Sequence, residues 1–126
     1  MRRAAFALGL LPLLGLAACE SSVDQQRATI CRRLVPALAP ADSTVRILRI
    51  GALRASDDLQ VDYAVIGGGS RSARQRRVVC GFGPGAELLG VSTEQGPMNG
   101  AALYLLKRYY LDTPEAAADD PVTAAH

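Results

Sequence analysis

The feature that most limits what this chain can fold into is an uncharged segment near its start. Arg2 and Arg3 are followed by Ala4–Ala18, which contains only Ala, Leu, Gly, Phe and one Pro. As a helix this segment would rise about 22 Å at ~1.5 Å per residue, short of the ~30 Å hydrocarbon core of a bilayer. A positive head, a short apolar run and small residues are typical of a secretory signal peptide rather than a membrane anchor. We therefore predict that residues 1–18 are removed.

A short motif stands at the predicted cleavage point. Leu16-Ala17-Ala18-Cys19 resembles the lipobox of bacterial lipoproteins, whose pattern is Leu, two small residues and Cys. The resemblance covers only the first 19 residues. It implies cleavage before Cys19 by a lipoprotein signal peptidase, a diacylglycerol on the thiol and an acylated amine. In that family an Asp after the cysteine favours the inner membrane, so Glu20 implies the outer membrane, on its periplasmic face. Ordinary secretory cleavage is the alternative.

The cysteine count supports lipidation. The chain has three cysteines, Cys19, Cys31 and Cys80, and an odd number in an exported protein requires an explanation. Lipidation of Cys19 leaves the other two free to pair in an oxidising compartment. Their disulfide would close a 50-residue loop, worth about 4 kcal/mol in the chain-entropy model. Two buried free thiols are the alternative, whereas a zinc site would need more Cys or His ligands than these two residues supply.

The charge balance of the mature chain is neutral. Without Arg2 and Arg3, the 14 basic residues become 12, equal to the 12 acidic ones. The chain therefore carries no general basicity that would indicate a nucleic-acid partner. From residue 19 onward it is long enough for one small domain. Residues 113–126 are acidic and rich in alanine with little apolar bulk, so we expect a disordered acidic tail.

The first predicted helix begins near Val23. Ser22 and Gln25 fit a capping box, which leaves residues 19–22 as a lipidated tether. Apolar residues then recur at helical spacing. Pro36 disfavours helix at Val35, so we expect the helix to end near Leu34 or Val35.

Four predicted strands follow. They cover residues 44–53, 59–65, 76–82 and 88–93, and the alternation of the first slips at Leu48, which predicts a bulge. Their short, Gly-rich or Asp-rich connections favour antiparallel neighbours. A last helix begins at Asn99 and stops before Pro114. The prediction for residues 23–112 is a small α+β domain: helix, four-stranded antiparallel sheet and helix, with both helices on one face.

The strongest surface feature is a group of arginines. Arg71, Arg74, Arg76 and Arg77 lie within seven residues, and arginine pairs bidentately with phosphate and carboxylate. They are candidates for binding lipid headgroups, lipopolysaccharide phosphates or an acidic partner, although runs of exposed charge favour the simpler alternative. The alternative is a solvated hairpin tip, neutralised in part by the acidic tail.

Catalytic signals are weak. The only histidine is His126, the last residue, which removes the usual nucleophile–histidine pairs and histidine-based metal hydrolysis. The stretch Gly81–Ala86 loosely matches a dinucleotide fingerprint, but a strand follows where that motif needs a helix. We expect no cofactor and no metal. A pair of carboxylates remains formally open to a glycan hydrolase; the candidates are Asp57, Asp58, Glu87 and Glu94.

Together these features predict a lipid-anchored, non-enzymatic module that binds another envelope component, whether a protein, a cell-wall polymer or a lipid headgroup. An inhibitor or immunity-type lipoprotein is the first alternative, and a carboxylate-based glycan hydrolase of the envelope is the second. Tyr104, Tyr109 and Tyr110 are candidates for a docking face on the last helix. Because the predicted tether is short, we also expect the body to sit close to the membrane, with its arginine hairpin available to phosphates.

Overall fold

The fold is known from a computed structural model that describes residues 15–53 and 56–124. Helix α1 (Gly15–Leu38) is followed by strands β1 (Ser43–Ala52), β2 (Leu59–Gly67), β3 (Ser70–Phe82), β4 (Leu88–Thr93) and β5 (Gly96–Pro97). Four short helical elements complete the chain: α2 (Gly100–Leu106), the π-helix η1 (Lys107–Leu111), α3 (Pro114–Ala118) and α4 (Pro121–Ala124). Residues 1–14 of the predicted signal peptide and the side chain of Cys19 lie outside the description, so cleavage and lipidation stay predictions.

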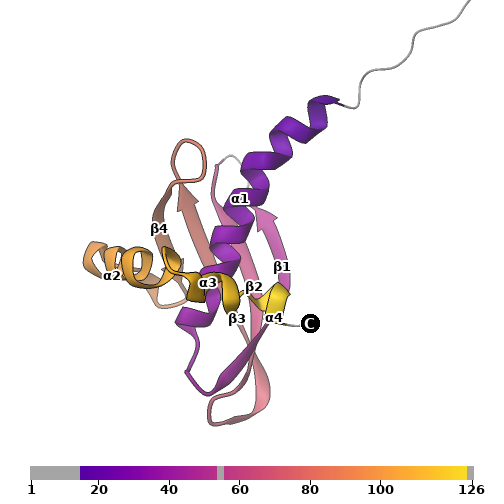
Figure 1. The fold of residues 1–126 in the computed structure, drawn as a ribbon. Coiled ribbons are helices and arrows are strands. Elements are labelled where there is room, and N and C mark those ends of the chain that lie inside the picture. The colour runs from indigo at the N-terminus through magenta and orange to yellow at the C-terminus, as the bar shows by residue number, and fades with distance from the viewer. Residues whose placement is uncertain (1–14, 54–55, 125–126) are drawn as a thin grey trace, which may run out of the picture.

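The strands form one antiparallel sheet in the order β1-β2-β3-β4-β5, with the helices packed across one face (Figure 1). The predicted α+β class and the four predicted strands are confirmed. The sequence analysis missed β5, a two-residue strand that pairs Pro97 with Ser92. The register of β1 on β2 shifts between Ile47 and Arg49, which confirms the bulge at Leu48.

Helix α1 is longer at both ends than the sequence analysis predicted. It passes through Ser22, which is therefore no N-cap, and the segment 19–22 expected as a tether is helical. It also continues past Pro36 to Leu38. A proline in the last turn removes one backbone hydrogen bond, whereas Leu34 and Val35 on that turn are fully buried against the sheet. Burial of two such side chains is worth about 1.5–3 kcal/mol each, enough to offset the loss.

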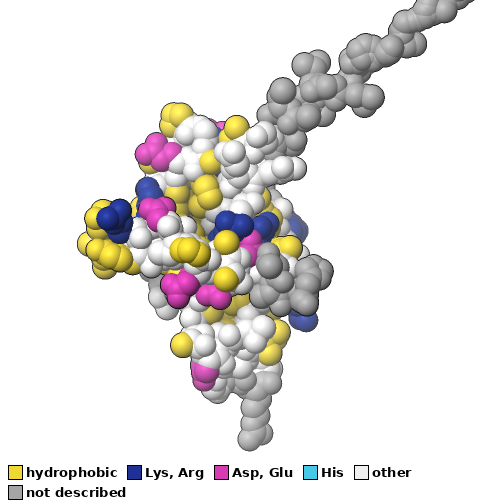
Figure 2. Space-filling model, viewed as in Figure 1, with side chains coloured by type: hydrophobic (Ala, Val, Ile, Leu, Met, Phe, Trp, Pro, Cys, Tyr) yellow, Lys and Arg dark blue, Asp and Glu magenta, His cyan; other side chains and the backbone are white. Residues whose placement is uncertain are grey.

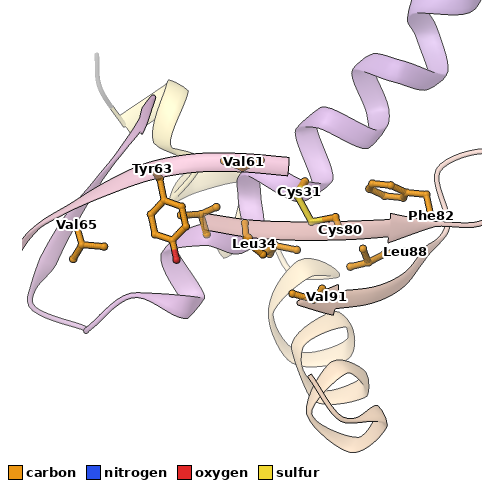
Figure 3. Close-up of a cluster of buried hydrophobic side chains, with 11 residues drawn as sticks. Cys31, Leu34, Val61, Tyr63, Val65, Cys80, Phe82, Leu88 and Val91 are labelled. Atoms are coloured by element: carbon orange, nitrogen blue, oxygen red, sulfur yellow. A yellow bond between two sulfur atoms is a disulfide. The ribbon is translucent and has the colours of Figure 1, made fainter. Parts of the chain in front are cut away.

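The core lies between α1 and the sheet (Figure 3). Val61, Tyr63 and Val65 of β2 are buried, as their predicted alternation requires. Cys31 and Cys80 are fully buried and joined by a disulfide with a Cα–Cα distance of 5.9 Å, so the predicted pairing is confirmed. The disulfide connects the C-terminal half of α1 to β3, the middle strand of the sheet.

The chain after residue 112 differs most from expectation. We expected residues 113–126 to be disordered, but α3 and α4 fold back beside α1 and β1, and Asp120 is only 1% exposed. The segment does lack apolar bulk. A buried carboxylate with several hydrogen bonds orders it instead, an interaction that composition does not reveal. Residues 125–126, and therefore His126, lie outside the description.

Candidate anion-binding groove

Strand β3 divides the predicted arginine group between two faces of the sheet. The strand begins at Ser70, not at residue 76, because Gly67 pairs with Ser70 and the turn needs only Gly68 and Gly69. All three glycines have positive φ, which suits so tight a turn. The strand therefore includes the arginines, and their predicted binding role stays a prediction.

Alternation along β3 decides which arginines meet. Side chains of successive strand residues point to opposite faces. Arg74 and Arg76 share the helix-covered face with Val78 and Cys80, whereas Arg77 points to the other face. The side chain of Arg71 lies outside the description. Two of the four predicted site residues, Arg74 and Arg76, are thus brought together on the helix-covered face of the sheet.

Arg74 and Arg76 line a hollow at the C-terminal end of α1. It has a volume of about 340 Å³ and includes Leu38, Ala39, Pro40, Tyr63, Val65 and Gln95 in its walls. A second hollow of about 380 Å³ shares Arg76 and Gln95 with the first and continues to Asn99 and Ala102 at the start of α2. We call these two connected hollows the distal groove.

The electrostatics of the distal groove favour an anion. The Nε atom of Arg74 is buried and has no hydrogen-bond partner among the described residues, and such an orphaned donor is costly unless a ligand satisfies it. Burial raises the pKa of Tyr63 and Glu94 raises it further, against an opposing effect of Arg76, so the hydroxyl stays neutral. Glu94 itself is held by the backbone N–H of Arg77 at 2.7 Å. The groove therefore combines two cations, Arg74 and Arg76, with neutral hydrogen-bonding groups and one carboxylate, Glu94, which already accepts a backbone hydrogen bond.

The groove lies far from the predicted lipid anchor. At the other end of the sheet Arg27 donates from Nε and Nη2 to the carbonyl oxygens of Gly85 and Gly83, at 2.6 and 3.1 Å. Figure 1 shows α1 leaving the domain at that end, whereas the β2–β3 hairpin lies at the opposite end. Along α1, Cys19 and Leu38 are about 28 Å apart at ~1.5 Å per residue. Since charges are screened beyond about 8–10 Å, attraction of these arginines to the anchoring bilayer would require the domain to lie along it.

A second pair of arginines, absent from the predicted site, holds the C-terminal segment. Arg32 donates from Nε and Nη2 to the two carboxylate oxygens of Asp120 at 2.7 and 2.8 Å, and Arg33 donates at 2.9 Å. The N–H of Val122 adds a bond of 3.1 Å. Burial opposes ionisation of Asp120, but the hydrogen bonds from both arginines prevail and lower its pKa to about 2. Basic and acidic side chains meet where the C-terminal segment crosses α1 (Figure 2).

The carboxylates considered for catalysis are dispersed. Asp57 is exposed and lies 3.6 Å from Arg27 at the anchor end, while Glu94 lies at the groove end. Glu87 is exposed beside the turn after β3, and the Gly81–Ala86 stretch leads into β4, a strand. In the described part of the chain, no three Cys, His, Asp or Glu side chains are grouped to hold a metal.

Helix α2 begins where the sequence predicted, after Asn99. The Oδ1 atom of Asn99 accepts a hydrogen bond from the N–H of Ala102 at 2.8 Å. Tyr104 and Tyr109 are exposed, and hydrophobic side chains gather over α2 in Figure 2.

Over the described ranges, no helix is long and apolar enough to span a membrane.

Comparison with known proteins gives no relative for this arrangement: no protein-family model, curated protein or solved structure matches the chain. Function must therefore be argued from the groove itself. The sequence analysis missed Tyr63, Pro40 and Gln95 as groove residues. The alternation of β3, extended back to residue 70, was the signal that would have placed Arg74 and Arg76 beside the core.

Proposed function

We propose that this protein is a lipid-anchored, non-enzymatic module of the cell envelope that binds another envelope component through the distal groove. The observation that carries the proposal is that two arginines, Arg74 and Arg76, line one hollow. Guanidinium groups without a carboxylate partner are suited to a phosphate or carboxylate supplied by a ligand.

Anchoring at Cys19 would suit a site at the far end of the domain. The lipid would hold the N-terminal end of α1 at the outer membrane, on the periplasmic face, and the groove would then be directed into the periplasm. A component of that space, rather than the anchoring bilayer itself, is therefore the partner we propose. The disulfide, which needs an oxidising compartment, fits the same location.

Two measurements test the proposal in the native envelope. The intact mass of membrane-extracted protein should show residues 1–18 removed and acyl chains on Cys19; an unmodified soluble form starting elsewhere would remove the anchor from the proposal. A photoreactive residue at Gln95, on the groove, should give a defined adduct that is lost in an Arg74→Ser/Arg76→Ser variant. Leu89 is an exposed control position at the anchor end. Equal adducts from both positions, or none from Gln95, would refute the groove as the binding site.

A further inference from the structure

One edge of β3 has no neighbouring strand over about half its length. The strand runs from Ser70 to Phe82, but its pairing with β4 covers only Val78–Phe82. Beyond that point the N–H of Arg77 is bonded by the side chain of Glu94 at 2.7 Å instead of by a strand. No strand of the described chain pairs with β3 on this side before Val78.

The backbone of β3 directs hydrogen-bonding groups outward along this edge. In an antiparallel sheet, alternate residues of a strand point their N–H and C=O groups to the same side. The N–H of Arg77 points away from β2, so the N–H and C=O groups of Gln75 point the same way, up to the register shift that lies between Ser70 and Arg74. An open row of this kind is a template for an added strand.

The side chains along the edge restrict what that strand can be. Arg74 and Arg76 lie two residues apart on the groove face, a spacing of about 6.6 Å. An extended peptide paired with the edge would place its own alternate side chains opposite them, and Asp or Glu at those positions would face the guanidinium groups that line the hollow. The hollow beside the edge, with Gln95 in its wall, leaves room for such side chains.

Two other occupants fit the charges poorly. A second copy of the chain, joined edge to edge, would bring arginines opposite arginines, and like charges in facing positions are destabilising. The acidic C-terminal segment of the same chain is already held elsewhere, because Asp120 is bonded to Arg32 and Arg33.

We propose that the free edge of β3 binds an extended acidic peptide segment by β-strand addition, with carboxylates at alternate positions received by Arg74 and Arg76. This inference rests on the proposed function and specifies its partner as a protein with an exposed acidic strand or tail.

Binding of a synthetic peptide tests the inference directly. The probe is a labelled eight-residue peptide of alternating Glu and Thr with blocked ends, titrated with membrane-extracted protein in neutral detergent and moderate salt. Fluorescence anisotropy should show saturable binding, weakened at least about tenfold by Arg74→Ser/Arg76→Ser. Arg46→Ser/Arg49→Ser removes two exposed arginines from β1 and is the matched control, expected to change affinity less than about twofold.

Two further arms separate strand addition from simple charge attraction. Gln75→Pro removes an outward N–H and leaves both arginines in place, and proline is tolerated where a strand edge faces solvent. This variant, and a peptide N-methylated at alternate amides, should each lose at least about tenfold in affinity. Unchanged binding in both arms would overturn strand addition, as would equal binding of an alternating Lys–Thr peptide. A groove adduct from Gln95 without peptide binding would refute the inference and leave the proposed function standing; absence of both would refute both.

Discussion

Two pairs of arginines in this molecule differ in whether their guanidinium groups have a carboxylate partner. Arg32 and Arg33 on α1 are both bonded to the buried carboxylate of Asp120. Arg74 and Arg76 on β3 line a hollow, and the Nε of Arg74 has no partner among the described residues. Satisfied cations in a closed network hold a fold together, whereas unsatisfied ones cost stability unless a ligand completes them. The first pair is therefore structural, whereas the second makes no ion pair with a residue of the described chain.

The largest expected loss of stability comes from removing the disulfide, because it helps to hold both arginine pairs in place. Both depend on α1 staying against the sheet, and the Cys31–Cys80 disulfide joins these two layers. Cys31→Ala/Cys80→Ala should lower the free energy of unfolding by about 2–5 kcal/mol, measured by urea denaturation. Wild-type protein in strong reductant is the control and should approach the variant. Alkylatable thiols at both positions in protein taken from the periplasm would contradict the pairing.

The next effect concerns the satisfied pair alone. Asp120→Asn removes the charge that Arg32 and Arg33 share and should cost about 2 kcal/mol of unfolding free energy, in line with a pKa of about 2 against a usual 3.8. The neighbouring Asp119, which is exposed, gives the matched variant Asp119→Asn, expected within about 0.5 kcal/mol of wild type. If the two variants lose the same stability, the network is not what orders the C-terminal segment.

The same carboxylate predicts a pH dependence. Because folding lowers the pKa of Asp120 to about 2, the unfolded chain takes up its proton first as the pH falls. The stabilisation is therefore complete above the unfolded pKa of 3.8 and disappears as the pH falls from there through about 2. Unfolding midpoints measured from pH 6 down to about 2 should fall more steeply for wild type than for Asp120→Asn. Parallel pH curves for the two proteins would show that folding does not lower the pKa of Asp120.

The smallest expected change in stability is that of a variant without Arg74 and Arg76, and it is best measured beside a variant without Arg32 and Arg33. Arg74→Ser/Arg76→Ser should shift the free energy of unfolding by no more than about 0.5 kcal/mol, since no internal bond of Arg74 Nε is lost. Arg32→Ser/Arg33→Ser should cost more than about 2 kcal/mol, because it leaves a buried carboxylate unpaired. Thermal and urea unfolding of the two double variants side by side provide the measurement. Equal losses would place Arg74 and Arg76 among the structural residues and remove the basis for a ligand.

Local patterns along the chain determined much of the fold. The alternation of residues 59–65, the slip at Leu48 and the cap at Asn99 all act over a few residues, and each is found as predicted. The disulfide also followed from the sequence, because the inward positions of Cys31 and Cys80 are set by the same periodicities. Arg74 and Arg76, which line the groove, could be named from the clustering of arginines in the sequence, but the face on which they meet could not.

The remaining features depend on contacts between segments that are distant in the sequence, so they could not be predicted from local patterns. Pro36 stays helical since the turn around it is buried on the sheet, and the segment after residue 112 is ordered by Asp120, 88 residues from Arg32. The groove exists because β3 extends beyond its pairing with β4 and because the C-terminal end of α1 lies beside that extension. Sequence alone thus determined which segments form helix and strand, through short-range periodicity. Packing decided which charged side chains are paired and which have no partner, because an ion pair depends on which residue the fold places opposite each charge.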